Sequence, residues 1–123
     1  MTSIDALAAA FFGAIERGDL EAVRATYAPD AIVWHNTDRQ EQNVDDNLRV
    51  LAWVVRNIAE RHYGDVQRVV LEDGFVQQHV LSGVGPNGAK FVLPAMMRVW
   101  VRDGRITRLD EYLDSSQVAA MMA

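Results

Sequence analysis

The sequence contains no cysteine among its 123 residues. A disulfide framework, a zinc site built on thiolates and a cysteine nucleophile are therefore excluded. Basic residues are also few, because twelve Lys and Arg stand against seventeen Asp and Glu, and the formal net charge is −5. The basic residues are scattered along the chain, whereas nucleic-acid binding needs a concentrated basic face, so we expect no nucleic-acid partner.

Long hydrophobic runs are absent too, since no stretch approaches the roughly 20 apolar residues that span a bilayer. The opening segment, MTSIDALAAAFF, lacks a basic region and is interrupted by Asp5, so we interpret it as a helix of the mature protein and not as a signal peptide. These features predict a cytoplasmic protein with no membrane partner. Half of the residues are apolar, which is enough for the core of a single domain over residues 1–123.

The last third of the chain predicts three consecutive antiparallel strands: Phe75–Ser82, Ala89–Arg102 and Arg105–Asp114. Asp103 and Gly104 form a strong signal for a tight hairpin, because a type I′ turn requires positive φ at both central positions. The middle strand would extend about 46 Å at roughly 3.3 Å per residue, so it must curl. Pro94 cannot donate to the ladder and predicts a bulge or bend within that strand.

Helices dominate the first half of the chain. The expected elements are a helix ending before Gly18, a helix at Leu20–Tyr27, a strand at Asp30–Asn36, a helix from Val44 to about His62, a strand at Asp65–Asp73 and a short final helix at Gln117–Met122. Thr2, Asp19 and Asn43 are the expected N-caps. The third helix carries a wide apolar stripe and must be nearly covered. The order of elements predicts an α+β fold, with helices packed on one face of a curled antiparallel sheet.

Three stretches resemble the SnoaL-like, polyketide cyclase-like branch of the nuclear-transport-factor-2-like superfamily. They are AIERGDLEAVRATYAPDAIVWHN, NVDDNLRVLAWVV and VRDGRITRLDEYLD. The resemblance covers nearly the whole chain. It implies a cone-shaped, cystatin-like sheet, mixed in strand direction, with three helices on its concave face. It also implies a deep pocket for a small hydrophobic molecule and pairing of two chains through the other face.

Two relatives suggest which positions matter. Against ketosteroid isomerase, the positions of its tyrosine, its neutral acid and its general base fall on Phe11, Met96 and His35. Two of these are apolar here, so only a base role for His35 is implied. Against limonene epoxide hydrolase, Glu111 matches a catalytic carboxylate.

The second relative also has a tyrosine-x-asparagine pair, which falls on Trp34 and Asn36 of this chain. The tyrosine is thus missing. Strand alternation lets either His35, or Trp34 and Asn36, face the pocket, and we favour His35.

Alternation and the resemblance together select the other residues that face this pocket. The expected set is Phe75, Gln77, His79 and Leu81 on the first of the three strands, Pro94, Met96, Arg98 and Trp100 on the middle strand, and Leu109, Glu111 and Leu113 on the closing strand. The pocket is expected to be lined by Phe11, Trp53, Phe75, Met96 and Leu113. An apolar cavity with a few converging polar groups is the usual form of a small-molecule site.

We expect Glu111, together with His79 or His35, to move protons, and Gln77 and Arg98 to orient a carbonyl or an enolate. Each residue has a structural alternative. Glu111 would form an ion pair with Arg98, His79 would be a hydrogen-bonded histidine of the sheet, and His35 would cap the sheet edge. A metal triad of the two histidines and Glu111 is a further alternative, but no pair has a local ligand spacing, so we predict no metal and no cofactor.

Two functions remain open. One is an enzyme that isomerises, cyclises, dehydrates or opens an epoxide in a hydrophobic, oxygenated substrate; the other is a non-catalytic ligand-binding or assembly module of the same fold. The face of the sheet away from the helices is also expected to be apolar: it should carry Val76, Val80, Val92 or Met97, and Val99. Such a face predicts a homodimer.

Overall fold

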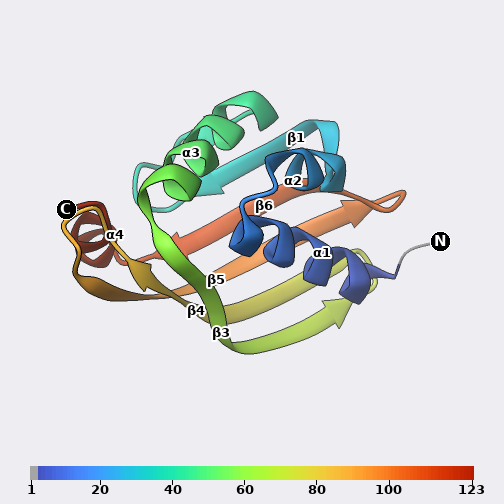
Figure 1. Ribbon diagram of the computed structural model, residues 1–123. Coiled ribbons are helices and arrows are strands. Elements are labelled where there is room, and N and C mark those ends of the chain that lie inside the picture. Colours follow the sequence, from blue (N-terminus) through green and yellow to red (C-terminus); the bar gives the residue numbers. More distant parts are fainter. Residues whose placement is uncertain (1–2) are drawn as a thin grey trace.

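The computed structural model describes residues 3–123 (Figure 1). Its elements are α1 (Ile4–Arg17), α2 (Leu20–Thr26), β1 (Tyr27–His35), β2 (Glu41–Gln42), α3 (Val44–Asn57), β3 (Ala59–Leu71), β4 (Gly74–Val84), β5 (Lys90–Arg102), β6 (Arg105–Leu113) and α4 (Ser115–Met122). The predicted α+β class is confirmed. The three helices expected to cover the sheet are α1, α2 and α3, and the short final helix predicted at Gln117–Met122 is α4.

The six strands form one sheet in the order β2-β1-β6-β5-β4-β3. β1 runs parallel to β6, and the other neighbours are antiparallel, so the sheet is mixed. Figure 1 shows α1, α2 and α3 together on one face of the sheet, with α4 beside one end of it. Helices thus cover one face of the sheet, and within residues 3–123 no helix covers the opposite face of β3 to β6.

Local capping signals set the boundaries of the first two helices. Ser3 caps α1, since its side-chain oxygen accepts from the amide of Ala6 at 3.0 Å. The predicted cap, Thr2, lies outside the described residues. Gly18 ends α1 in the left-handed conformation at φ 75°, and Asp19 caps α2, both as predicted.

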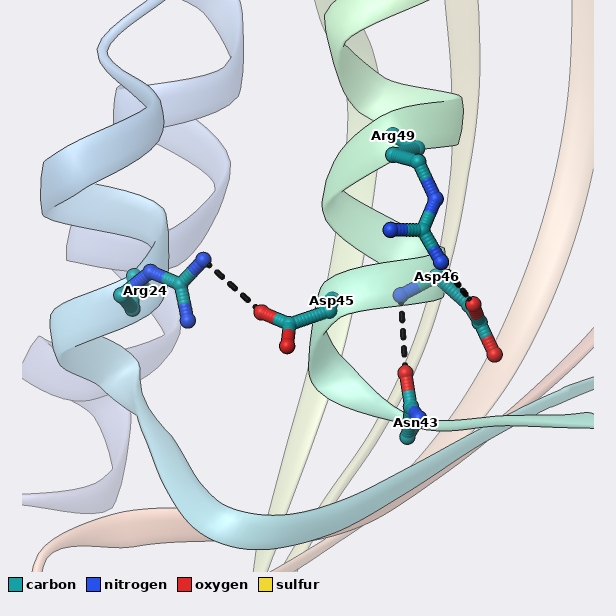
Figure 2. A network of polar contacts seen from close by, with 5 residues as sticks. All are labelled: Arg24, Asn43, Asp45, Asp46 and Arg49. Carbon is teal, nitrogen blue, oxygen red and sulfur yellow. Dashed lines mark hydrogen bonds and ion pairs between the residues drawn. The ribbon is translucent and has the colours of Figure 1, made fainter.

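The N-terminus of α3 is tied to α2 by a small polar network (Figure 2). Asn43 is the predicted cap, and its side chain accepts from the amide of Asp46 at 2.8 Å. Arg24 of α2 reaches the carboxylate of Asp45 at 3.0 Å, and Arg49 pairs with Asp46. These groups are largely exposed, so they orient α3 more than they stabilise it.

The predicted extension of α3 to His62 is wrong. The helix ends at Asn57, and Ile58 already has the extended angles φ −109° and ψ 112°. Glu60 and Asp65 then adopt positive φ of 56° and 49° within β3. Gly64, expected to end the helix, lies inside the strand next to a register shift.

A tertiary contact explains the early end of α3. The guanidinium of Arg61 donates to the carbonyls of Val55 and Ile58, at 3.1 and 2.6 Å. It also donates to the carbonyls of Ile15 and Glu16 in the last turn of α1, both at 3.1 Å. One side chain thus bonds carbonyls at the ends of two helices. This arrangement requires the chain to turn away from α3 before residue 61.

The predicted bulge at Pro94 is also wrong. The pairing of β4 with β5 runs without interruption from the pair Gly74 and Trp100 to the pair Val84 and Lys90. In chain order, Ala95 is the first residue of β5 that pairs with β6, and Pro94 comes just before it. The missing amide of Pro94 therefore interrupts no bond to β6. The irregularity of β5 instead lies between Trp100 and Val101.

The core lies between the helices and the inner face of the sheet. Its members include Phe11, Phe12, Ile15, Val23, Tyr27, Val33, Phe75, Met97, Val99, Ile106 and Leu109. On β5 the buried residues are Leu93, Ala95, Met97 and Val99. The predicted alternation of β5 was therefore off by one residue.

Candidate functional site

A cavity of about 290 Å³ lies between the helices and the inner face of the sheet. Its walls are mostly apolar and come from several elements, including Phe11 of α1, Trp53 of α3, Met97 of β5, and Leu109 and Leu113 of β6. The volume is near the lower end of the usual range for ligand pockets, about 300–1,000 Å³. It suits a molecule of about two fused rings.

His35 and Glu111 form the central polar pair of this cavity. They are direct partners in the parallel ladder between β1 and β6, so both side chains project from the same face. The distance from His35 Nε2 to Glu111 Oε1 is 3.0 Å, and the two side chains are 19% and 18% exposed. A close, mostly buried pair of this kind can hold and transfer a proton.

The pKa of His35 reflects two opposing effects. Burial lowers this pKa, but the hydrogen bond to Glu111 and the charges of Glu111 and Asp38 outweigh burial, so the pKa of His35 is raised above its ordinary value. The imidazolium form of His35, paired with an ionised Glu111, is therefore favoured to higher pH than in a free histidine.

His79 provides the second polar group of the cavity. It is 3% exposed, and its Nδ1 lies 2.8 Å from the side-chain nitrogen of Gln77, which is fully buried behind it. The aromatic rings of Phe12 and Tyr63 stand edge-on against the imidazole, at centroid distances of 5.3 and 4.9 Å. Burial lowers the pKa of His79, although the charge of Glu111 acts in the opposite direction. The two histidines thus have opposite protonation preferences.

Two tyrosines also belong to the polar lining, beside Thr37, Asp38, Gln42 and Asn47, and sequence reasoning missed both tyrosines. Tyr27 donates from its hydroxyl to the side-chain oxygen of Asn47 at 2.8 Å, in the buried interior. Tyr63 lines the cavity beside His79. Burial is the main cause that raises the pKa of both tyrosines, so both stay neutral. Tyr63 was missed because its segment was assigned to α3; the polar run from Glu60 to His62 interrupts the helical stripe and could have marked the strand.

The structure places the remaining predicted pocket residues in different positions. Phe11, Trp53 and Leu113 line the cavity. Phe75 and Gln77 point inward as predicted but are fully buried outside the lining, Phe75 in the core and Gln77 behind His79.

Met96 and Arg98 lie on the opposite face of the sheet, so their predicted place in the pocket is wrong. Met96 is 47% exposed. Arg98 bonds to the carboxylate of Asp73 at 2.8 Å and stacks over Trp100. The predicted ion pair between Arg98 and Glu111 does not form. The cause is the reversed alternation of β5, which turns Met97 and Val99 inward.

The choice between His35 and its two neighbours is decided by the ladder. Trp34 packs against Tyr112 at a centroid distance of 5.4 Å, on the outer face. Asn36 uses its side chain to bond both the amide and the carbonyl of Leu113, at 2.8 and 3.1 Å. It extends the pairing of β1 with β6 and does not line the cavity. His35 therefore faces the cavity, as favoured from the sequence.

Within residues 3–123, no group of three or more His, Asp and Glu side chains is placed to hold a metal ion, so His35, His79 and Glu111 do not form the triad considered above. Over the same residues, no helix has both the length and the apolar character needed to cross a membrane.

A profile of the SnoaL-like domain matches residues 8–109, most of the chain. The chain belongs to the SnoaL-like domain family. This membership agrees with the resemblance drawn from the three sequence stretches, and it accounts for a mixed sheet that encloses a cavity against helices. A comparison of this SnoaL-like chain with curated proteins found no match.

Solved structures support the same fold. A candidate polyketide cyclase from Pseudomonas putida KT2440 superposes with a TM-score of 0.85 at 20% identity, covering 100% of both chains. IdmH, a candidate polyketide cyclase from Streptomyces antibioticus, gives 0.84 at 22% identity, covering 98% of each chain. A nuclear-transport-factor-2-like protein from Burkholderia pseudomallei K96243 gives 0.85 at 18%, covering 100% of this SnoaL-like chain and 99% of that one. At these identities the likeness establishes the fold alone.

Proposed function

We propose that this SnoaL-like protein binds a hydrophobic, oxygenated small molecule, such as a polyketide-, terpenoid- or steroid-like compound, and performs acid–base chemistry on it. The observation that carries the proposal is the pair His35 and Glu111, 3.0 Å apart at the wall of an apolar cavity. Isomerisation and cyclisation are the reactions that best suit a carboxylate supported by a histidine. Both begin with a proton transfer and involve no net oxidation or reduction, so neither needs a redox cofactor.

Glu111 is the proposed base. One of its oxygens already accepts from His35, and the carboxylate takes a proton from a carbon beside a substrate carbonyl. The electrons of the broken C–H bond then form an enolate. The enolate carbon either regains the proton at another position, which isomerises the substrate, or attacks a second carbonyl of the same molecule, which closes a ring. Glu111 returns the proton it took, to carbon in the isomerisation and to the alkoxide oxygen of the attacked carbonyl in the ring closure, and His35 holds the carboxylate in place.

The test is deuterium exchange into a simple ketone. 2-Tetralone is a bicyclic ketone of suitable size with acidic hydrogens beside its carbonyl. In heavy water we expect the protein to accelerate exchange at these positions, and Glu111→Gln to reduce the acceleration by about 100-fold or more. Glu72→Gln, which changes an exposed carboxylate in the turn between β3 and β4, is the matched control.

The non-catalytic alternative predicts a different result. The protein would then bind 2-tetralone, detected by a shift in melting temperature, while the exchange rate stayed equal to that of buffer alone. That outcome would contradict the proposed chemistry and support a ligand-binding module.

We further propose a homodimer formed through the outer face of the sheet, as expected for relatives of this fold. Large apolar side chains are exposed there: Val92 is 62% and Met96 47% exposed on β5, and Tyr112 is 52% exposed on β6. Of the residues first assigned to this face, Met97 and Val99 are instead buried inside. Light scattering should give twice the chain mass of 13.8 kDa; a mass of one chain at micromolar concentration would contradict the proposal.

A further inference from the structure

Three polar side chains form a line that ends on His79. Asp5 of α1 pairs with Arg68 Nη1 of β3 at 2.8 Å. The Nε of Arg68 donates to the side-chain oxygen of Gln77 on β4, also at 2.8 Å. The side-chain nitrogen of Gln77 lies 2.8 Å from His79 Nδ1. The line thus runs from α1 through the edge strand to the cavity wall.

The direction of these hydrogen bonds follows from the chemistry of each group. A guanidinium has only donors, so Arg68 must face the oxygen of the Gln77 amide, and the amide NH₂ must face His79. Since that NH₂ also donates, His79 Nδ1 has to accept and carries no proton. The single proton of a neutral imidazole then resides on Nε2. An imidazolium would place its Nδ1–H against the NH₂ group without an acceptor.

The other ring nitrogen faces the cavity. His79 lines the cavity, and among residues 3–123 its Nε2 has no hydrogen-bond partner. Within the same residues, the only fully buried side-chain polar atom without a hydrogen-bond partner is the side-chain oxygen of Gln42. The unpaired Nε2 of His79 is therefore not fully buried. Tyr63, which stands beside it, adds a neutral hydroxyl to this wall.

We propose that Asp5, Arg68 and Gln77 hold His79 as a neutral Nε2–H donor, and that this donor recognises a carbonyl oxygen of the ligand. The proposal rests on the proposed function, and it narrows the substrate class to molecules with a ketone or a comparable carbonyl. It separates the roles of the two histidines: His35 supports a base, whereas His79 hydrogen-bonds the oxygen on which negative charge develops. A donor fixed in this way needs no reorganisation when the enolate forms.

The charged and titratable groups near His79 bear on its protonation. Glu111 faces it from β6, Tyr63 from β3, and Arg68 stands behind Gln77. The ionised Glu111 favours a charged His79, while burial and the Gln77 NH₂ oppose it. We expect the second effect to prevail, so that His79 remains neutral at pH 6.

The first experiment is nitrogen NMR of the histidine-labelled protein, which needs no ligand. At pH 6 and 8 we expect the Nε2–H tautomer for His79. Gln77→Glu replaces the NH₂ with a carboxylate acceptor, so it should raise the pKa of His79 and move its proton to Nδ1. Gln78→Glu makes the same change on the adjacent exposed residue and should leave His79 unchanged. A wild-type His79 that is charged at pH 6 or protonated on Nδ1 would overturn the inference.

The second experiment compares 2-tetralone with tetralin, the same two rings without the carbonyl. At a pH where NMR shows His79 of Gln77→Glu to be neutral and protonated on Nδ1, we expect this variant to lower the ratio of ketone affinity to hydrocarbon affinity by about fivefold, the usual effect of one hydrogen bond, and Gln78→Glu to leave the ratio unchanged. An equal ratio in all three proteins, or no binding of either probe, would overturn carbonyl recognition.

The two proposals fail separately. If the tautomer and the ratio behave as expected but deuterium exchange is not accelerated, the carbonyl site stands and the acid–base function falls. If exchange depends on Glu111 while the ratio does not depend on Gln77, the acid–base function stands and the role of His79 falls.

Discussion

Glu111→Gln offers the sharpest test of the pair formed by His35 and Glu111. The substitution keeps the shape of the side chain and one oxygen that can accept from His35 Nε2, but it removes the negative charge. It therefore replaces a charge-assisted hydrogen bond, worth about 1.5–3 kcal/mol, with a neutral one worth about 0.5–1.5 kcal/mol. We expect a loss of about 1 kcal/mol at low pH.

The size of this loss depends on what His35 can do. Had Glu111 paired with an arginine, the variant would contain an uncompensated buried charge, which typically costs about 3–5 kcal/mol. His35 can instead release its proton and become neutral. For a chain of 123 residues, about 1 kcal/mol corresponds to a fall in melting temperature of about 4 °C.

The loss should also depend on pH, with a definite sign. The folded-state pKa of His35 is raised by Glu111 and Asp38 despite burial. Stability from such a group is fully present below the ordinary histidine pKa, about 6.5, and is lost as the pH rises through the folded-state pKa. The difference between wild type and Glu111→Gln should therefore be largest near pH 5.5 and shrink to a few tenths of a kcal/mol at high pH.

The assay is a set of thermal melts at pH 5.5 and pH 8.5 for wild type, Glu111→Gln and the control Glu72→Gln. The control should melt within about 1 °C of wild type at both values. A loss for Glu111→Gln that is equal at both pH values, or larger at pH 8.5, would refute the assignment of the pair. A fall of more than about 12 °C for Glu111→Gln would indicate an uncompensated buried charge, which the structure does not predict for this variant.

Three further predictions concern other contacts. His35→Gln should remove the same pH-dependent stability, and adding Glu111→Gln to it should cause little further change in melting temperature at pH 5.5. If the double variant instead lost the sum of the two single losses, the coupling of His35 with Glu111 would be contradicted. Tyr27→Phe leaves the buried oxygen of Asn47 without its donor, so it should cost about 1–2 kcal/mol, and a fall in melting temperature below about 1 °C would count against that bond. Met96→Lys should convert the proposed dimer to a monomer in light scattering with little change in ligand affinity, because Met96 lies on the face opposite the cavity.

Much of the fold was predictable because its signals are local. Capping by Asp19 and Asn43, the stop at Gly18 and the turn at Asp103 and Gly104 each depend on residues within about four positions of one another. The inward faces of β4 and β6 were also predictable, because alternation along a regular strand is local once one residue is placed. The resemblance to the SnoaL-like family supplied that placement.

The errors arose where contacts between segments distant in the sequence decided the outcome. The end of α3 was misplaced because Arg61 satisfies carbonyls of α1 and α3 together, a contact between segments distant in sequence. The face of β5 was reversed because the resemblance placed Met96 in the pocket and alternation placed Arg98 with it, whereas the fold turns Met97 and Val99 inward. The expected partner of Glu111 changed from Arg98 to His35 as a direct consequence.

The sequence by itself determined the class of fold, the helix caps, the tight turn and the residue types available for chemistry. Only the tertiary structure decided which of these residues meet. The pair of His35 with Glu111 requires the parallel register of β1 against β6, and the orientation of His79 requires Arg68 of β3 to reach Gln77 of β4. The physical reason is that backbone propensities act over a few residues, whereas the protonation of a buried group is set by whatever the fold brings within about 3 Å of it.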